Sequence, residues 1–509
     1  MKRLSIVIAL ATGLILSSCS KKSPDFINSI PDDAIGVVSL HPMQLHTKSQ
    51  INSLEAIKER VKDEIWIQLL EDPLSTGLML DEYTYLFIKM EENGPIIGVV
   101  SGMKDVEKFV STLSKIKEDL NEEFKEMEGY TYFQPDEEGV IAWNEEQMIL
   151  LGSPDSDEFE ESYWTGSLDK MFNPVKEESI TSLVDFKDFL GKMKDLNVWI
   201  STNEMRGVIE KVAKDKIPDL PVSLYNNYAQ VYIDFSDGAM NITGETHFSE
   251  EVEKNVEEFL VMNPSLNEEM LNLTPGGNLL IAMAGSMDLE KIQNMVKKFA
   301  PPQIDSVGNK VEEAIGISGK EILNALTGDF TIAVNGLEGE VMIPVEVFIG
   351  FGVKSELLQE HLLGMVEGMV PVEEQGDFFV INFQGNEVYS GIINDLWVIT
   401  NAKGYKDAVE GGKLDNSLAD SKFKDFSDGS MGMYVNMDLS SYPSMVKGLV
   451  EQNSEKNKWI GHITEPFDYL GISASNNQSI ITLKTNNPSE NSLYTILKMT
   501  DTPETDSPE

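Results

Sequence analysis

The order of apolar segments in the chain repeats: the segments after about residue 270 follow the order of those after about residue 30. Six elements recur in register, separated by between 237 and 251 residues by subtraction of their positions. The clearest is Phe-Lys-Asp-Phe, at residues 186–189 and again at 423–426. One such match arises easily by chance, but six in the same order do not. The sequence therefore predicts an internal duplication.

Proline and glycine set the limits of the two predicted repeats. The boundary falls between Asn263-Pro264 and Pro275-Gly276, where both residue types interrupt regular structure. The acids and prolines after residue 500 predict disorder. The expected organisation is a signal peptide at 1–18, a lipidated tether at 19–29, repeat 1 at 30–265, repeat 2 at 270–499 and a disordered acidic tail at 500–509.

The order of elements in repeat 1 suggests a fold class. The patterns predict strand 35–40, helix 51–70, strands 83–89 and 96–101, helix 105–120 and strand 130–134. This β-α-β-β-α-β series is the split βαβ, or ferredoxin-like, order. Tight turns join many of the strands, which favours antiparallel pairing. We expect an α+β fold of two tandem related units, with mainly antiparallel sheets and helices on one face.

The chain is strongly acidic. It holds 85 acidic and 40 basic residues, for a formal net charge of −45. Such a surface repels nucleic acid phosphates and anionic lipid headgroups, which excludes nucleic acid as a partner. The simplest interpretation is a solvated surface that keeps the protein soluble. Attraction of cationic partners or divalent ions is the alternative.

Cys19 is the only cysteine. It follows Lys2-Arg3, a short apolar run and the small residues Ser17-Ser18, which is the layout of a secretory signal too short to span a bilayer permanently. The pattern resembles the lipobox of bacterial lipoproteins, in which signal peptidase II cuts before the cysteine. The resemblance implies that Cys19 becomes the lipidated first residue. An internal disulfide, thiol catalysis and cysteine-based zinc sites are then excluded.

A broader resemblance rests on the lipobox, on Ile-Pro-Asp-Asp-Ala at 30–34 before the first Val-Val-Ser strand, and on the doubled layout. Together these features resemble the Bacteroidota lipoproteins grouped as domain of unknown function 4836. That family has no established activity, so the resemblance implies only a cellular localisation and an architecture. Surface-exported lipoproteins of Bacteroidota usually carry an acidic cluster after the lipidated cysteine, whereas residues 20–24 have none. This implies an outer-membrane anchor facing the periplasm. Asp305-Ser306-Val307 resembles the Bacteroidota O-glycosylation sequence, which makes Ser306 a candidate for modification.

Nucleophile and metal motifs each fail at a required position. None of the five histidines forms His-Glu-x-x-His, and Pro42 separates His41 from His46. Ser101 stands one place late for a nucleophile elbow and is expected to end a strand. Ser444 and Lys447 have a catalytic serine-to-lysine spacing without its companion motifs.

Phosphate, calcium and aromatic patterns are equally incomplete. Residues 316–321 contain Gly-Lys but lack the first glycine and the hydroxyl of a phosphate loop. Residues 155–160 lack the ligand and glycine of an EF-hand, although a loose calcium site there or at 136–138 stays open. The tryptophans are expected in the core, with Trp164 beside Gly166 as the candidate for an exposed platform.

These observations predict a lipid-anchored, non-enzymatic protein of the cell envelope, a binding or assembly module without catalytic residues, metal or cofactor. The expected partners are the membrane, through the lipid, and an envelope protein or glycan. The groove between the two repeats is the default ligand site. Two alternatives remain: a glycan or peptidoglycan hydrolase with carboxylates from separate loops, and a surface glycan-binding lipoprotein.

Overall fold

The computed structural model describes most of the chain after residue 24. The described residues are 25–500 except 56–57, 59–66, 68–70, 92–93, 118–122, 137–138, 154–159, 203–204, 206–226, 251, 253–260, 300–311, 313–315, 338–343, 384–385, 410–413 and 453–463. The predictions for Cys19, Ser306 and the acidic tail therefore lie outside the described residues, as does most of the predicted helix 51–70.

The chain divides into two compact units. The N-terminal unit comprises residues 1–42 and 72–193, and the C-terminal unit comprises residues 43–71 and 194–509. These limits differ from those of the predicted repeats, because residues 194–247 belong to the C-terminal unit. The reason is a strand pair distant in sequence: β10 (Ala239–His247) pairs along its length with β20 (Gln478–Thr485).

The N-terminal unit contains an antiparallel sheet with the strand order β1-β2-β3-β7-β6-β5-β4. Its strands are β1 (Ala34–Leu40), β2 (Thr84–Glu91), β3 (Gly94–Gly102), β4 (Lys125–Met127), β5 (Tyr130–Asp136), β6 (Gly139–Trp143) and β7 (Gln147–Gly152). The helices among its described residues are η1 (Asp25–Ser29), η3 (Pro73–Thr76), α5 (Val106–Lys117), α6 (Glu161–Phe172), η5 (Lys176–Glu178), η6 (Ile180–Ser182) and α7 (Val184–Lys192).

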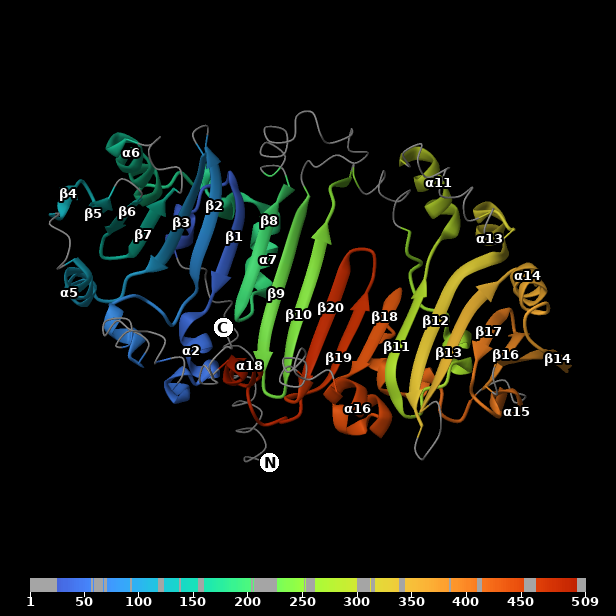
Figure 1. The fold of residues 1–509 in the computed structure, drawn as a ribbon. Helices are drawn as coiled ribbons and strands as arrows, with labels where there is room; N and C mark the ends of the chain where they lie inside the picture. Colours follow the sequence, from blue (N-terminus) through green and yellow to red (C-terminus); the bar gives the residue numbers. More distant parts are fainter. Residues whose placement is uncertain are drawn as a thin grey trace, which may run out of the picture. The chain divides into compact units, whose positions relative to one another are not determined.

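The sheet of the C-terminal unit is also antiparallel, with the order β8-β9-β10-β20-β19-β18-β11-β12-β13-β17-β16-β15-β14 (Figure 1). Besides β10 and β20, its strands are β8 (Leu196–Ser201), β9 (Tyr228–Ser236), β11 (Leu279–Ser286), β12 (Leu326–Gly336), β13 (Val345–Val353), β14 (Val372–Gln375), β15 (Phe378–Phe383), β16 (Asn386–Ile393), β17 (Leu396–Thr400), β18 (Met431–Asn436) and β19 (Phe467–Ala474). Its helices include η2 (Ile51–Ser53), α10 (Glu268–Leu273), α11 (Leu289–Phe299), α13 (Gly319–Ala325), α14 (Leu357–Val366), α15 (Tyr405–Val409), η7 (Leu418–Asp420), η8 (Lys422–Phe426), η9 (Leu439–Ser441), α16 (Ser444–Gln452) and α18 (Ser492–Thr500). Helix α2 (Pro42–Ser49) begins at the last residue of the N-terminal unit.

The mixed α+β class and the antiparallel pairing are as predicted, but the ferredoxin-like arrangement is wrong. A split βαβ unit needs two parallel strands joined by a crossover helix. Strand β1 instead pairs antiparallel with β2, and β3 pairs antiparallel with β7. The described strands follow the predicted order along the chain, but their neighbours in space are those of consecutive antiparallel strands.

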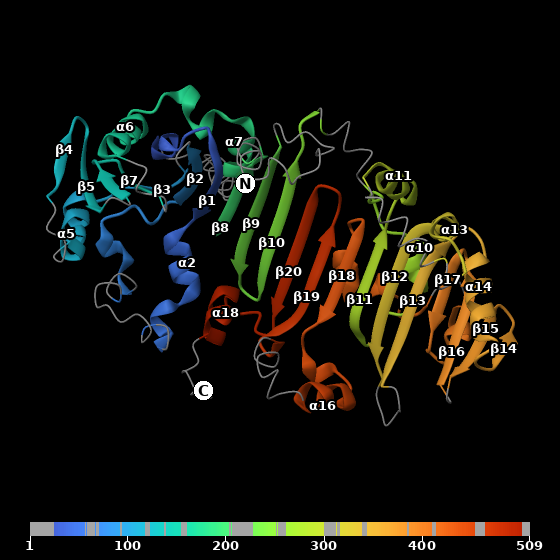
Figure 2. The ribbon, with the colours of Figure 1, turned by 45° about the horizontal axis from the view of Figure 1, so that its top comes forward.

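The core of the C-terminal unit lies on one face of its sheet. Ala282, Ala333, Phe348 and Tyr434 are paired across β11, β12, β13 and β18, and all are buried. Helix α10, which lies beside β12 in Figure 2, packs on this face together with α15, η7 and η8. Their buried side chains include Met270, Leu271, Leu273, Tyr405, Leu418, Phe423 and Phe426.

The opposite face of the same strands is apolar too, yet partly exposed. Ile281 is paired with Val334 on β12 and with Val435 on β18, and Val334 is paired with Val347. Ile281 is 38% exposed, and the three valines are neither buried nor fully exposed. Apolar side chains on both faces explain why the strands alternate only partly in sequence.

Candidate functional site

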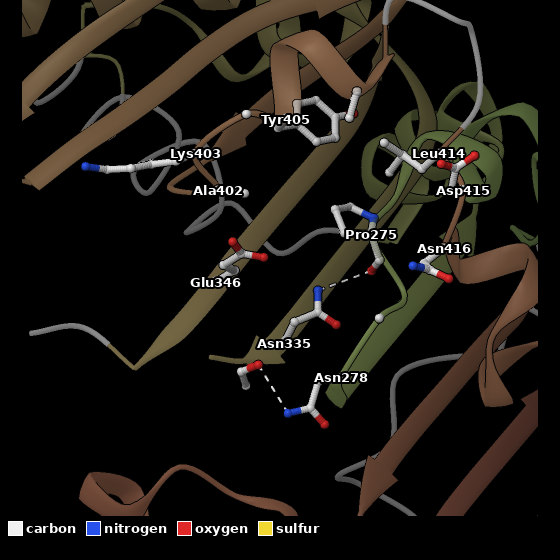
Figure 3. Close-up of a pocket in the computed structure, with 14 residues that line it drawn as sticks. Pro275, Asn278, Asn335, Glu346, Ala402, Lys403, Tyr405, Leu414, Asp415 and Asn416 are labelled. Atoms are coloured by element: carbon white, nitrogen blue, oxygen red, sulfur yellow. Dashed lines mark hydrogen bonds between the residues drawn. The ribbon is translucent and has the colours of Figure 1, made fainter. Parts of the chain in front are cut away.

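A cavity of about 380 Å³ lies in the C-terminal unit where the covered face of the sheet ends (Figure 3). It is bounded by the start of β11, the end of β12, the start of β13 and the residues around α15. The volume falls in the range of small-molecule sites. The lining residues are Pro275, Gly277, Asn278, Asn335, Gly336, Glu346, Ala402, Lys403, Gly404, Tyr405, Ala408, Leu414, Asp415 and Asn416.

Asn335 is the most unusual residue of this cavity. It lies at a break in register, since Leu279 pairs with Asn335 while Ile281 pairs with Val334. Such a bulge commonly redirects side chains beside functional sites. The residue is 4% exposed, and its Nδ2 donates to the Pro275 carbonyl oxygen at 3.4 Å. Its Oδ1 is buried and has no hydrogen-bond partner among the described residues, which costs about 1–3 kcal/mol.

Backbone contacts frame the cavity. Asn278 and Gly336 bind each other twice: Gly336 N donates to the Asn278 carbonyl at 2.8 Å, and Asn278 Nδ2 donates to the Gly336 carbonyl at 3.2 Å. The Tyr405 hydroxyl donates to the Leu273 carbonyl at 2.7 Å. Burial raises the pKa of Tyr405 far above its ordinary value, so this hydroxyl remains a donor.

The charges around the cavity are mainly negative. Burial raises the pKa of the half-buried Glu346 carboxyl. Asp415 is exposed at the rim. The Lys403 ammonium is 79% exposed and lies 3.7 Å from the Glu387 carboxylate, outside the lining set.

The described lining residues lack a nucleophile paired with a histidine base. Nucleophilic catalysis needs a nucleophile beside a base that accepts its proton. The residues that line this cavity include no serine, cysteine or histidine, and the tyrosine hydroxyl is occupied by a backbone carbonyl. The cavity presents amide and carboxylate groups that can bind and orient a ligand.

A second cavity of about 370 Å³ lies in the N-terminal unit, among β2, β3, β7 and α6. Its lining residues are Pro31, Phe87, Lys89, Glu91, Ile96, Leu151, Ser162, Tyr163, Gly166, Ser167, Lys170 and Met171. Lys89 Nζ lies 2.9 Å from Asp33 Oδ2 and 3.0 Å from Glu91 Oε1. Burial disfavours the charge on Lys89, but these two carboxylates outweigh it and raise the pKa of Lys89.

The two cavities occupy corresponding positions in the strand ladders. Lys89 pairs with Ala34 beside a break in register, as Asn335 pairs with Leu279. On the other side, Lys89 pairs with Ile96 and Asn335 pairs with Glu346. An ammonium group in the N-terminal unit thus corresponds to an amide in the C-terminal unit.

The residues considered in sequence motifs have structural roles where the structure describes them. Ser101 is buried at the end of β3, as predicted, within 3.1 Å of the Thr84 hydroxyl. Lys447 Nζ donates to the Ser440 carbonyl at 2.6 Å. His41 is 9% exposed and stacks edge-to-face on Tyr83 at 5.1 Å.

Of the phosphate-loop and calcium-loop segments, the structure describes the first and only a small part of the others. Ser318 and Glu321, in the segment compared with a phosphate loop, form a capping box at the start of α13. Residues 155–159 and 137–138 lie outside the described residues.

The prediction of an exposed Trp164 is wrong. Its side chain is fully buried in α6, with Leu168 one turn later. Neighbouring glycine suggested exposure, but Gly166 lies on another face of the helix. Trp143, Trp199 and Trp397 are in the core, as predicted.

The sequence did not identify Asn335 or Glu346. Asn335 ends the apolar run of a hairpin strand and Glu346 lies near the start of the next, where polar residues are ordinary. One signal was available in the sequence: Lys89, at the position of the first hairpin that corresponds to Asn335, is charged.

Comparison with protein families decides the classification. The family model described as "Domain of unknown function (DUF4836)" matches residues 26–493. The chain belongs to the DUF4836 family. No curated protein matches this DUF4836 chain. Among the residues that the structure describes, none forms a helix with the length and apolarity needed to cross a membrane.

The DUF4836 chain has a distant likeness to three solved structures of one protein. "Structure of crystal form I of TP0453" is 12% identical with a TM-score of 0.27, covering 48% of this chain and 90% of that one. Crystal form III is 10% identical with a TM-score of 0.28 and the same coverage. Crystal form IV is 10% identical with a TM-score of 0.28, covering 44% and 81%.

Proposed function

We propose that this protein is a lipid-anchored, non-enzymatic binding module of the cell envelope, and that the cavity around Asn335 is its ligand site. The observation that carries the proposal is the cavity itself, which is lined by the half-buried Glu346 and, opposite it on β12, by Asn335, whose buried Oδ1 has no partner among the described residues. Unsatisfied buried polar groups are uncommon because they destabilise the fold. A ligand that donates to this oxygen offsets that cost.

We also propose that the two tandem units predicted from the sequence arose by duplication. Supporting this, the order β1-β2-β3-β7-β6-β5-β4 recurs as β11-β12-β13-β17-β16-β15-β14. Ile180 N donates to the Ile30 carbonyl at 2.9 Å, and Leu418 N donates to the Thr274 carbonyl at 2.7 Å. Both donors begin a short 3-10 helix, η6 or η7.

The strand pair β10–β20 fits the same history. Each strand is the second of the last hairpin in its repeat, and the two run antiparallel with Ile242 opposite Ile481. Asn241 then faces Thr482, and Thr243 faces Ile480. The pairing is therefore symmetric about Ile242 and Ile481. Two related subunits that meet through the same surface make this kind of isologous contact.

Ligand binding is tested by closing the cavity. Ala408 is exposed on α15 and lines the cavity, so Ala408→Trp is expected to occupy it without disturbing the core. Thermal unfolding of the mature protein would be followed against panels of amines, sugars, amino acids and fatty acids. A saturable stabilisation by one class is expected in the wild type and expected to be lost in Ala408→Trp.

Asp407→Trp is the matched control, since Asp407 is exposed on the same short helix outside the lining set. It should retain the ligand response. Absence of a response to every panel would overturn the binding proposal. Released products from cell-wall or glycan substrates at high protein concentration would instead support the hydrolase alternative.

The lipid anchor is a separate part of the proposal. Labelled palmitate is expected to mark the wild-type protein in cells, and Cys19→Ser is expected to abolish the label because the chain has no other thiol. Ser18→Ala keeps a small residue before the cysteine and should remain labelled. An unlabelled wild type would refute the anchor, and whole-cell protease shaving would separate a periplasmic from a surface orientation.

A further inference from the structure

The cavity of the C-terminal unit offers more hydrogen-bond acceptors than free donors. The acceptors are the Asn335 amide oxygen and the Glu346 and Asp415 carboxylates. The side-chain donors of Asn278, Asn335 and Tyr405 already bind protein oxygens, and the exposed Lys403 ammonium pairs with Glu387 at 3.7 Å. A ligand that satisfies this lining must therefore bring donors of its own.

The charge of the site narrows the class of ligand. Glu346 is half-buried, and burial raises its pKa. A buried carboxylate without a cation is costly. A positively charged donor would satisfy both Glu346 and the neutral Asn335 oxygen, whereas a neutral donor would leave the charge uncompensated.

The N-terminal unit provides an internal comparison. At the register position that corresponds to Asn335, Lys89 places an ammonium group between the carboxylates of Asp33 and Glu91. The same part of the ladder therefore holds a cation supplied by the chain itself. In the C-terminal unit the lysine is replaced by asparagine, and an acid, Glu346, stands opposite.

We propose that the cavity of the C-terminal unit binds the primary ammonium group of a ligand between Asn335 Oδ1 and the Glu346 carboxylate. This inference rests on the proposed binding function. Asn335 and Glu346 are directly opposite on β12 and β13, where side chains start about 4.5–5.5 Å apart, and both line the cavity. A cavity of about 380 Å³ also has room for the ligand's organic body.

The test compares n-butylamine with n-butanol, which have the same alkyl chain but differ in charge. Isothermal titration with the mature protein at neutral pH is expected to show saturable binding of the amine, and binding of the alcohol at least tenfold weaker. Glu346→Gln and Asn335→Leu are each expected to weaken amine binding at least tenfold. Glu374→Gln removes an exposed acid of β14 outside the cavity and should bind like the wild type.

The two variants differ in their risk of misfolding. Asn335→Leu changes a buried residue and could prevent folding, whereas Glu346→Gln keeps the shape of a half-buried side chain. If Asn335→Leu does not fold, the result for Glu346→Gln decides the test. Equal binding of amine and alcohol, or amine binding unaffected by Glu346→Gln, would overturn the inference. If sugars or fatty acids stabilise the wild type but not Ala408→Trp while the amine does not bind, the inference fails and the binding function stands.

Discussion

Phe423→Ala is expected to destabilise the C-terminal unit by about 3–5 kcal/mol, the usual cost of removing a buried phenyl ring. Phe423 is fully buried in η8 and belongs to the core cluster on the covered face of the sheet. Its ring fills the space beside Gly432, where an added Cβ would lie 2.7 Å from the ring carbon Cζ. Because strand β18 already lies against the ring at Gly432, the unit has little freedom to close the resulting cavity.

Urea unfolding of the mature protein measures this loss. Lys424→Ala is the matched control, because Lys424 is the exposed neighbour on the same 3-10 helix and should change stability by less than about 0.5 kcal/mol. Phe186 in the N-terminal unit is also fully buried, so Phe186→Ala is expected to show a comparable loss. Similar stabilities of Phe423→Ala and Lys424→Ala would contradict the assigned core.

Local patterns predicted the individual strands and helices well. Strand 35–40 is β1 at Ala34–Leu40, and helix 105–120 is α5 at Val106–Lys117. Hairpin turns and apolar periodicity act between residues close in sequence, so a single sequence carries this information. The Phe-Lys-Asp-Phe segments likewise bury their phenylalanines in both units.

Neighbours in space were less predictable. The ferredoxin-like prediction followed from the order of elements, but the order along the chain does not decide whether β1 pairs with β2 or with another strand. The pairing of β10 with β20 joins residues more than 230 positions apart, as in Ala239 with Lys484, and no local pattern specifies it. Because of this pairing, the limit between the two compact units lies at residues 193 and 194 and not in the proline-containing segment near residue 270.

The candidate site was missed for a related reason. Asn335 and Glu346 are ordinary residues for the ends of a hairpin, and their importance comes from a bulge and a cavity that exist only after folding. Trp164 shows the opposite error, in which a neighbouring glycine suggested exposure while helical geometry turned the indole inward. The motif-based exclusions of catalysis and metal binding stay predictions.

Gly328→Ala is expected to be the second most damaging substitution, costing about 3 kcal/mol or more. Gly328 lies in β12 with φ of +109°, a conformation that side chains with a Cβ rarely adopt. An added Cβ would lie 1.8 Å from the Met287 carbonyl oxygen. The backbone cannot move away easily, because Met287 N donates to the Gly328 carbonyl at 3.1 Å.

Gly364→Ala in α14 provides the control in the same unit. Its added Cβ would meet nothing within 4 Å, and alanine favours the helix, so a gain of about 0.5–1 kcal/mol is expected. The two substitutions add the same methyl group, and only local geometry separates their effects. Urea unfolding midpoints should therefore move in opposite directions, and a tolerated Gly328→Ala would show that β12 does not follow the path beside Met287 that brings Asn335 to the cavity.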